Sequence, residues 1–181
     1  MVDNKANFQN IKVLALDVDG VLTNGGIFIG NQGELCKRFD VQDGLGISLA
    51  LRNDLTIALI SGRHSEILLR RAKELGITLV SESVMDKRVV LEQLAQENGW
   101  QLEEIAFMGD DLNDLPAMGV AGISLAPSNA AIDVKKRAHY ITQAAGGQGA
   151  VREVIEVILR SRGIWDKIVI DYTASGQGDK Q

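Results

Sequence analysis

The sequence has only one cysteine, Cys36, so it cannot form an internal disulfide, and a lone free cysteine is typical of a reducing compartment. It has no run of 18 apolar residues, so no membrane span is expected. Met1 to Asn10 lacks the apolar core of a signal peptide. A formal net charge of −5 disfavours nucleic acid, whose phosphate backbone calls for a basic surface. We therefore expect a cytoplasmic protein that binds neither membranes nor nucleic acid.

What the chain does contain is an ordinary globular composition. Its 181 residues are 45% apolar and 24% charged, which suits one domain with its own core. We expect that domain to span residues 1–172. The last residues, 173–181, are polar and contain glycine, so we expect a flexible C-terminal tail.

Short apolar runs alternate with longer amphipathic stretches along the chain. The runs lie at 13–16, 57–60, 77–80, 105–108 and 122–125, with a weaker sixth at 139–142. Predicted helices lie near 44–53, 64–75, 87–98, 112–118, 129–137 and 150–162, and Gly76 and Gly99 are predicted to end two of them. The alternation predicts an α/β fold: a Rossmann-like, doubly wound parallel sheet with helices on both faces.

One stretch departs from this alternation. Between residues 26 and 39, two short β-prone runs flank Gly30-Asn31-Gln32-Gly33, which predicts a small β-hairpin flap.

Polar side chains follow the predicted strands. Asp17 and Asp19 follow the first run, Ser61 and Arg63 the second, and Asp110 the run at 105–108, while Lys87 begins a helix. Ligands of open α/β sheets bind at the carboxyl ends of the strands, so we expect these side chains to converge.

Clustered carboxylates favour a bound cation, and oxygen ligands select a hard ion such as Mg²⁺. We predict that Asp17 and Asp110 bind it, with a backbone carbonyl at Asp19 as a third ligand. Ser61 can donate to a phosphate oxygen, and Lys87 can act on phosphate as a point charge. The pattern predicts that Asp17 attacks phosphorus to form an aspartyl-phosphate and that Asp19 is the acid/base. Asp111 and Asp114 either support the site or cap a helix.

These segments resemble the four motifs of the haloacid dehalogenase superfamily, in order: Asp17 to Thr23, Ser61, Lys87, and Gly109 to Asp114. Phosphatases of that superfamily generally carry the second aspartate, here Asp19. The intervals from Asp19 to Ser61 and from Lys87 to Asp110 leave no room for a cap domain. The resemblance therefore implies a capless phosphatase.

Over its whole length the chain is similar to the family of 3-deoxy-D-manno-octulosonate 8-phosphate phosphatases. The segments that carry this similarity are 16–23, 39–44, 60–63 and 146–153. The resemblance implies a homotetramer with its hairpins in a central barrel, and a tail that reaches a neighbouring active site. It also implies substrate contacts at Asp19, Asp40, Val41, Gln42, Asp43, Gly44, Arg63, Arg71, Lys87 and Asn113.

Several alternatives stay open. Helical geometry places Arg70 nearer to Arg63 than Arg71, whereas the resemblance favours Arg71. At a further position where the family commonly has arginine, this chain has Ser48. The Gly146–Gly149 loop is either a simple turn or a flank of the site. The substrate could be another acidic sugar phosphate of the sialic type. A non-catalytic oligomerisation module and a phospho-acceptor receiver are the rival functions.

Overall fold

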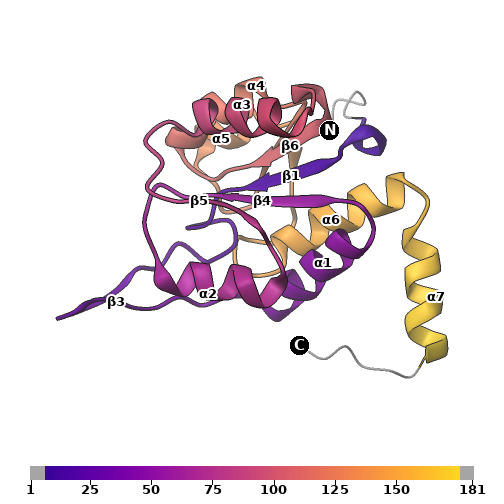
Figure 1. The fold of residues 1–181 in the computed structure, drawn as a ribbon, viewed down its shortest axis with the longest axis horizontal. Helices are drawn as coiled ribbons and strands as arrows, with labels where there is room; N and C mark the ends of the chain where they lie inside the picture. The colour runs from indigo at the N-terminus through magenta and orange to yellow at the C-terminus, as the bar shows by residue number, and fades with distance from the viewer. Residues whose placement is uncertain (1–6, 176–181) are drawn as a thin grey trace.

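The computed structural model describes residues 7–175 and centres on a six-stranded parallel sheet (Figure 1). Its strand order is β5-β4-β1-β6-β7-β8, so the first strand lies in the middle between β4 and β6. The strands are β1 (Val13–Leu16), β4 (Thr56–Ile60), β5 (Leu79–Ser81), β6 (Ile105–Met108), β7 (Ile123–Ala126) and β8 (Tyr140–Ile141). This arrangement confirms the predicted parallel sheet.

Helices cover both faces of the sheet (Figure 1). One face carries α1 (Val41–Arg52), α2 (Glu66–Leu75) and α6 (Ala150–Ser161), and the other carries α3 (Lys87–Asn98), α4 (Leu115–Val120) and α5 (Ile132–Lys135). Every residue of β1 is buried: Leu14 and Leu16 enter one hydrophobic core, and Val13 and Ala15 enter the other. A strand covered on both faces reads as a continuous apolar run, which is the pattern that predicted it.

Helix caps explain where the crossover helices begin and end. The side chains of Asp40, Ser65 and Asp86 accept hydrogen bonds from the first free amides of α1, α2 and α3. Gly76 and Gly99 end α2 and α3 in the left-handed conformation, as predicted.

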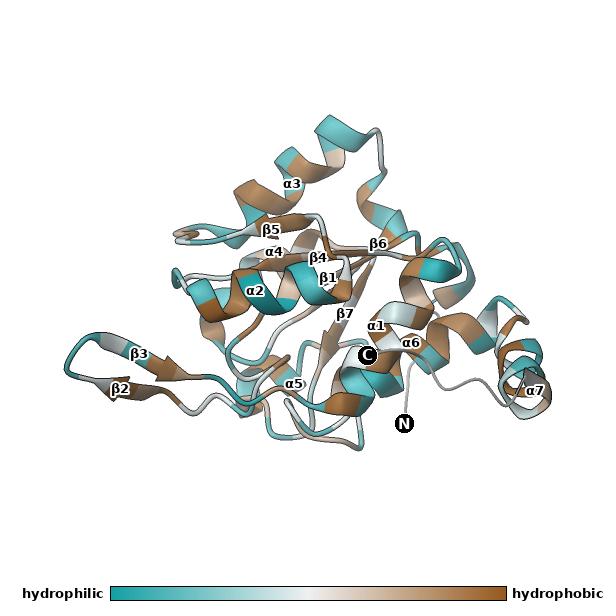
Figure 2. Ribbon diagram, turned by 60° about the horizontal axis from the view of Figure 1, so that its bottom comes forward, coloured by the Kyte–Doolittle hydropathy of each residue, from teal (hydrophilic) through white to brown (hydrophobic). Residues whose placement is uncertain are grey.

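The predicted hairpin is also present. Strands β2 (Phe28–Gly30) and β3 (Gly33–Cys36) pair antiparallel and extend away from the main sheet (Figure 2). Apolar side chains of this hairpin face solvent, with Ile29 and Leu35 each about two-thirds exposed. The hairpin thus presents an apolar surface beside the carboxyl end of the sheet.

Several segments differ in detail from the predictions. The helix predicted at 112–118 is a 3₁₀ turn, η3 (Leu112–Asp114), followed by α4, and the one predicted at 129–137 is only the short α5. Two further 3₁₀ turns, η1 (Phe8–Asn10) and η2 (Leu102–Glu104), precede β1 and β6. A last helix, α7 (Trp165–Ser175), was not predicted, because its β-branched Ile168-Val169-Ile170 run has low helix propensity.

The predicted tail overlaps this last helix. Thr173 to Ser175 complete α7, and residues 176–181 lie outside the described residues. The division into a domain of 1–172 and a flexible tail therefore stays a prediction.

The two intervals that could hold a cap are filled by ordinary elements. Within the described chain, only the hairpin, α1 and β4 lie between Asp19 and Ser61, and only α3, η2 and β6 between Lys87 and Asp110. Among residues 7–175, no helix is long and apolar enough to cross a bilayer.

Candidate active site

The loop after β1 is held at both ends. The amide of Asp17 donates to the Met108 carbonyl at 2.9 Å, which continues the β1–β6 ladder by one residue. The buried Thr23 hydroxyl accepts hydrogen bonds from the amides of Gly20 and Gly25 at 3.3 and 3.2 Å. These bonds close the loop into a compact turn and fix the Asp17 carboxylate at the end of the central strand.

Lys87 connects this loop to the loop after β6. Its ammonium donates to Asp17 Oδ1 and to Asp114 Oδ1, both at 2.6 Å, and its side chain is 3% exposed. Burial alone would lower the pKa of Lys87, but the carboxylates of Asp17 and Asp114 outweigh it and raise the pKa. Lys87 therefore stays charged and holds the two loops in one geometry.

Asp110 completes an acidic cluster with Asp17 and Asp114, whose carboxylate oxygens can all lie within 4.8 Å of one another. Burial, followed by the charges of Asp17 and Asp114, raises the pKa of Asp110. Burial and the charge of Asp114 likewise raise the pKa of Asp17, although Lys87 opposes this. A divalent cation would reverse both effects, so this all-oxygen donor set fits a hard metal ion.

Asp114 contributes to this cluster mainly as a support. Its Oδ1 accepts from Lys87, and its Oδ2 accepts from the amides of Asp110 and Asp111 at 2.8 and 3.1 Å. Asp111 Oδ1 accepts from the Leu112 amide at 2.8 Å and caps η3. With both Asp114 oxygens engaged, Asp17 and Asp110 are the carboxylates best able to bind a metal.

Asp19 lies apart from this acidic cluster. Its Oδ1 accepts from the ammonium of Lys37 at 2.5 Å, and its Oδ2 lies 3.7 Å from Nε of Arg63. That Oδ2 is buried without a hydrogen-bond partner among the described residues. The metal ligand predicted at Asp19 was a backbone carbonyl, and that ligand stays a prediction.

An open pocket of about 300 Å³ joins these groups. The predicted residues that line it are Asp17, Asp19, Ser61, Arg63, Lys87, Asp110 and Asn113. Gly25, Ile27, Gly62 and Asp111 complete the lining. The Ser61 hydroxyl, at the end of β4, donates to the Arg63 carbonyl at 3.0 Å and accepts from the Arg63 amide at 3.2 Å. The structure thus brings the four predicted motifs to one edge of the sheet.

Comparison with known proteins agrees with this geometry. Residues 74–155 match the family model of the haloacid dehalogenase-like hydrolases. The 3-deoxy-D-manno-octulosonate 8-phosphate phosphatase of Yersinia pestis is 44% identical over 150 residues, covering 83% of this chain and 80% of that protein. The chain belongs to the haloacid dehalogenase-like hydrolases. Within that family it is a phosphoric monoester hydrolase.

Solved structures of this hydrolase family superpose closely on the chain. The Moraxella catarrhalis 3-deoxy-D-manno-octulosonate 8-phosphate phosphatase, in complex with magnesium, phosphate and KDO, has a TM-score of 0.89 at 38% identity; 92% of this chain and 95% of that one are covered. The cobalt-bound phosphatase of Haemophilus influenzae has a TM-score of 0.86 at 40% identity, with 88% and 93% covered.

The substrate contacts predicted at Asp40, Val41, Gln42, Asp43, Gly44 and Arg71 lie outside the lining of the hydrolase pocket. Asp40 caps α1, with its Oδ1 2.8 Å from the Gln42 amide. The Arg71 guanidinium lies beside Gly44 and 5.9 Å from the centre of the Phe39 ring. These residues gather near the start of α1, and their role toward substrate stays a prediction.

Asp43 has a different environment. It is 1% exposed and accepts hydrogen bonds from the amides of Arg152 at 2.8 Å and Gly149 at 3.3 Å. Burial raises its pKa to about 6, and the two amide hydrogen bonds oppose that rise. Asp43 thus joins α1 to the amino end of α6, a link between residues 106 and 109 positions apart that the sequence pattern did not reveal.

The Gly146–Gly149 loop lies beside the loop that follows β1. The Gly147 amide donates to the Val21 carbonyl at 2.9 Å, and the Gly146 amide donates to Asn129 Oδ1 at 2.8 Å. Of the two interpretations left open, these contacts favour the loop as a flank of the site.

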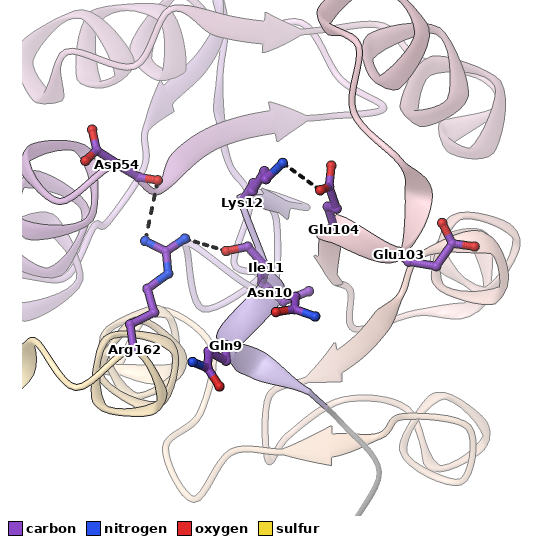
Figure 3. A pocket seen from close by; sticks show the side chains of 8 residues that line it. All are labelled: Gln9, Asn10, Ile11, Lys12, Asp54, Glu103, Glu104 and Arg162. Carbon is purple, nitrogen blue, oxygen red and sulfur yellow. Dashed lines mark hydrogen bonds and ion pairs between the residues drawn. The ribbon is translucent and has the colours of Figure 1, made fainter.

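A larger hollow of about 560 Å³ lies where β1 and β4 begin (Figure 3), and it shares no lining residue with the pocket of the candidate site. Both of its cations have partners: Lys12 Nζ is 2.6 Å from Glu104 Oε1, and the Arg162 guanidinium donates to carbonyls of Ile11, Asn53 and Asp54. These contacts tie the end of α6 to the sheet and give the hollow a structural role.

Proposed function

We propose that this hydrolase is a Mg²⁺-dependent phosphatase that converts 3-deoxy-D-manno-octulosonate 8-phosphate into the free sugar acid and phosphate through an aspartyl-phosphate, a step in lipopolysaccharide precursor synthesis. The observation that carries the proposal is the convergence of Asp17, Lys87 and Asp110 at the floor of an open pocket that also presents Asp19 and Arg63. The names of its relatives support the choice of substrate.

Asp17 is the nucleophile of the first chemical step. One of its carboxylate oxygens attacks phosphorus as the bond from phosphorus to the sugar oxygen breaks, and Asp19 gives that oxygen its proton. Water then attacks the aspartyl-phosphate after giving a proton to Asp19, which releases phosphate and restores Asp17. Lys87 orients Asp17 for both steps because it grips Oδ1 at 2.6 Å.

Charge in the pocket suits a phosphate group. Mg²⁺ held by Asp17 and Asp110 would neutralise charge on the phosphate oxygens when bound. Ser61, 3% exposed at the end of β4, has a hydroxyl that can donate to phosphate once it leaves the Arg63 carbonyl. Lys87 adds a fixed positive charge.

Recognition of an acidic sugar needs a further cation near the pocket mouth. Arg63 lines the pocket and keeps 45% of its side chain exposed. A guanidinium can grip a carboxylate with two parallel hydrogen bonds. We infer that Arg63 selects the sugar carboxylate and that Asn113 binds a hydroxyl.

The chemistry is tested with Asp17→Asn. It keeps the side-chain shape but removes the nucleophile, so phosphate release should fall to the background rate while thermal unfolding stays cooperative. Asp166→Asn, an exposed carboxylate on α7, is the matched control and should keep full activity. Full activity in Asp17→Asn would exclude the covalent mechanism.

The substrate is tested with a panel of acidic and neutral sugar phosphates in the presence of Mg²⁺. We expect the octulosonate 8-phosphate to give the highest kcat/KM and a nine-carbon sialic-type phosphate to give less. Arg63→Lys should lower kcat/KM for acidic members more than for neutral ones, because an ammonium cannot grip a carboxylate through two fixed hydrogen bonds. Equal turnover across the panel would contradict the assignment.

We also propose that the protein is a cytoplasmic homotetramer, as the family resemblance implies. The exposed apolar side chains of the hairpin, Ile27, Phe28, Ile29 and Leu35, support an interface there. Light scattering after size exclusion measures the mass directly. Replacing Ile29 and Leu35 by serine should shift that mass toward the monomer.

A further inference from the structure

The hairpin reaches the catalytic groups through one side chain, Lys37. This lysine follows β3, and its side chain is only 3% exposed although the hairpin itself projects from the body of the protein (Figure 2). Its ammonium contacts Asp19 Oδ1 at 2.5 Å and Glu34 Oε1 at 3.0 Å. Burying an ammonium between two carboxylates costs desolvation free energy. Such an arrangement therefore points to a role for the position of Lys37.

Glu34 ties the same group to the body of the enzyme. Its second carboxylate oxygen accepts a hydrogen bond from the hydroxyl of Ser65, the residue that caps α2. A continuous series of contacts therefore runs from Asp19 through Lys37 and Glu34 to Ser65. It fixes the hairpin lysine against a rigid helix start rather than leaving it on a free loop.

The contacts of the Asp19 carboxylate indicate what this series of contacts does. Lys37 occupies Oδ1, whereas Oδ2 has no hydrogen-bond partner among the described residues. A carboxylate that transfers a proton must have one oxygen within hydrogen-bond reach of the reacting atom, and Oδ2, which lies 3.7 Å from Nε of Arg63 but has no hydrogen-bond partner among the described residues, is the oxygen of Asp19 that remains for this. The two oxygens of Asp19 are thus not equivalent.

We propose that Lys37 is a positioning residue for Asp19, which anchors Oδ1 so that Oδ2 faces the leaving-group oxygen. The inference rests on the proposed role of Asp19 and deepens it. Lys37 itself takes no proton from the substrate. It acts by holding the acid/base in one rotamer, and the proton moves from Asp19 to the sugar oxygen as the bond from phosphorus to that oxygen breaks.

The leaving group provides a selective test. Nitrophenolate leaves without full protonation, whereas a sugar alkoxide needs the proton from Asp19. Lys37→Met removes the ammonium and keeps the apolar stem. It should lower kcat/KM for the sugar phosphate by about 10-fold or more, which is part of the roughly 100- to 10,000-fold that general acid–base catalysis contributes. For p-nitrophenyl phosphate the loss should be several-fold smaller.

A double-mutant cycle tests whether Lys37 acts through Asp19. In an Asp19→Ala background, adding Lys37→Met should change kcat/KM less than twofold, because the group to be positioned is already gone. Lys37→Arg, which keeps the charge and donors, should recover part of the activity. Lys12→Met is the control for loss of a lysine ion pair away from the site: Lys12 Nζ lies 2.6 Å from Glu104 at the far end of the sheet, although its side chain is 60% exposed, and its loss should leave turnover of both substrates unaffected.

Two results would overturn the proposal. One is an equal loss for both leaving groups, which would indicate a general structural defect. The other is a full additional loss in the Asp19→Ala background. If Lys37→Met failed to fold, as judged by thermal unfolding, Glu34→Gln would replace it, since weakening the grip on Lys37 should produce the same dependence on leaving group. Failure of the proposed chemistry itself would show separately, as full activity in Asp17→Asn.

Discussion

Gly146 lies so close to Gly20 that a Cβ atom on Gly146 would be 1.7 Å from the Gly20 carbonyl oxygen. The obstacle is backbone and cannot rotate away, so only glycine fits between α5 and α6 at this point. The contact joins the loop before α6 directly to the turn that carries Asp17 and Asp19.

Gly146→Ala should therefore displace the loop that carries Asp17 and Asp19. We expect a stability loss of about 1–3 kcal/mol from overpacking. We also expect a loss of activity that can reach about 100-fold, because catalysis is sensitive to misplacement by an ångström. Steady-state kinetics and thermal unfolding measure the two effects. Gly119→Ala, where nothing lies within 4 Å of the new Cβ, is the control and should leave both nearly unchanged. Normal activity in Gly146→Ala would show that the loop tolerates the shift.

Lys87 should be essential for stability as well as for activity. Lys87→Met leaves the Asp17 and Asp114 carboxylates buried without their shared cation, which should cost about 3–5 kcal/mol. Urea unfolding measures this loss. The neighbouring Arg88 is exposed and pairs with Glu92 on the surface of α3, so Arg88→Met is the control and should change stability by less than about 1 kcal/mol. A stable, active Lys87→Met variant would contradict the role assigned to the ammonium.

Metal binding should stabilise the folded protein. Mg²⁺ at 100 times its Kd adds about 2.7 kcal/mol if it binds only the native state, so Tm should rise with Mg²⁺ and fall back with a chelator. Asp110→Asn removes one ligand and should abolish the rise, whereas Asp133→Asn, on the surface of α5, should keep it. A rise in Tm that persisted in Asp110→Asn would place the metal elsewhere.

Asp43 should make stability depend on pH in the acid range. Its pKa is raised from 3.8 to about 6 in the folded state, so the folded protein holds this proton when the unfolded chain has lost it. The free energy of unfolding should therefore fall as the pH rises from about 4 to about 6, by at most about 3 kcal/mol from this group. Above that range its contribution is constant.

The difference in unfolding free energy between Asp43→Asn and the parent isolates this contribution, since other carboxyls titrate alike in both. The variant should gain stability relative to the parent as the pH rises from about 4 to about 6. Asp166→Asn, whose carboxylate is 92% exposed, should show a flat difference. A flat curve for Asp43→Asn would show that the amide hydrogen bonds cancel the cost of burial.

The sequence predicted where most polar side chains of the candidate site lie, because each of these follows a buried strand. A parallel strand covered on both faces has an unmistakable apolar pattern, and topology alone then places Asp17, Ser61 and Asp110 at one edge of the sheet. The prediction depended on local pattern and a general rule of connection, not on tertiary detail.

Contacts between distant segments were not predictable in this way. The hairpin pattern gave no sign that Lys37 turns back onto Asp19, and the Asp43 carboxylate meets amides more than 100 positions away. Helix α7 was missed because β-branched residues in its middle favour strands, while packing of Trp165 and Ile168 against the core stabilises a helix. Tertiary contacts of this kind have no local periodicity.

The central position of β1 in the sheet has a consequence for folding during translation. This strand and the aspartates after it leave the ribosome early, yet β1 pairs with β6 through Met108, and Gly146 closes the turn from even farther along the chain. A nascent chain shorter than about 150 residues thus contains Asp17 and Asp19 but lacks the contacts that fix their positions. Phosphate-releasing activity should therefore appear abruptly, near the end of translation, and should not increase gradually with chain length.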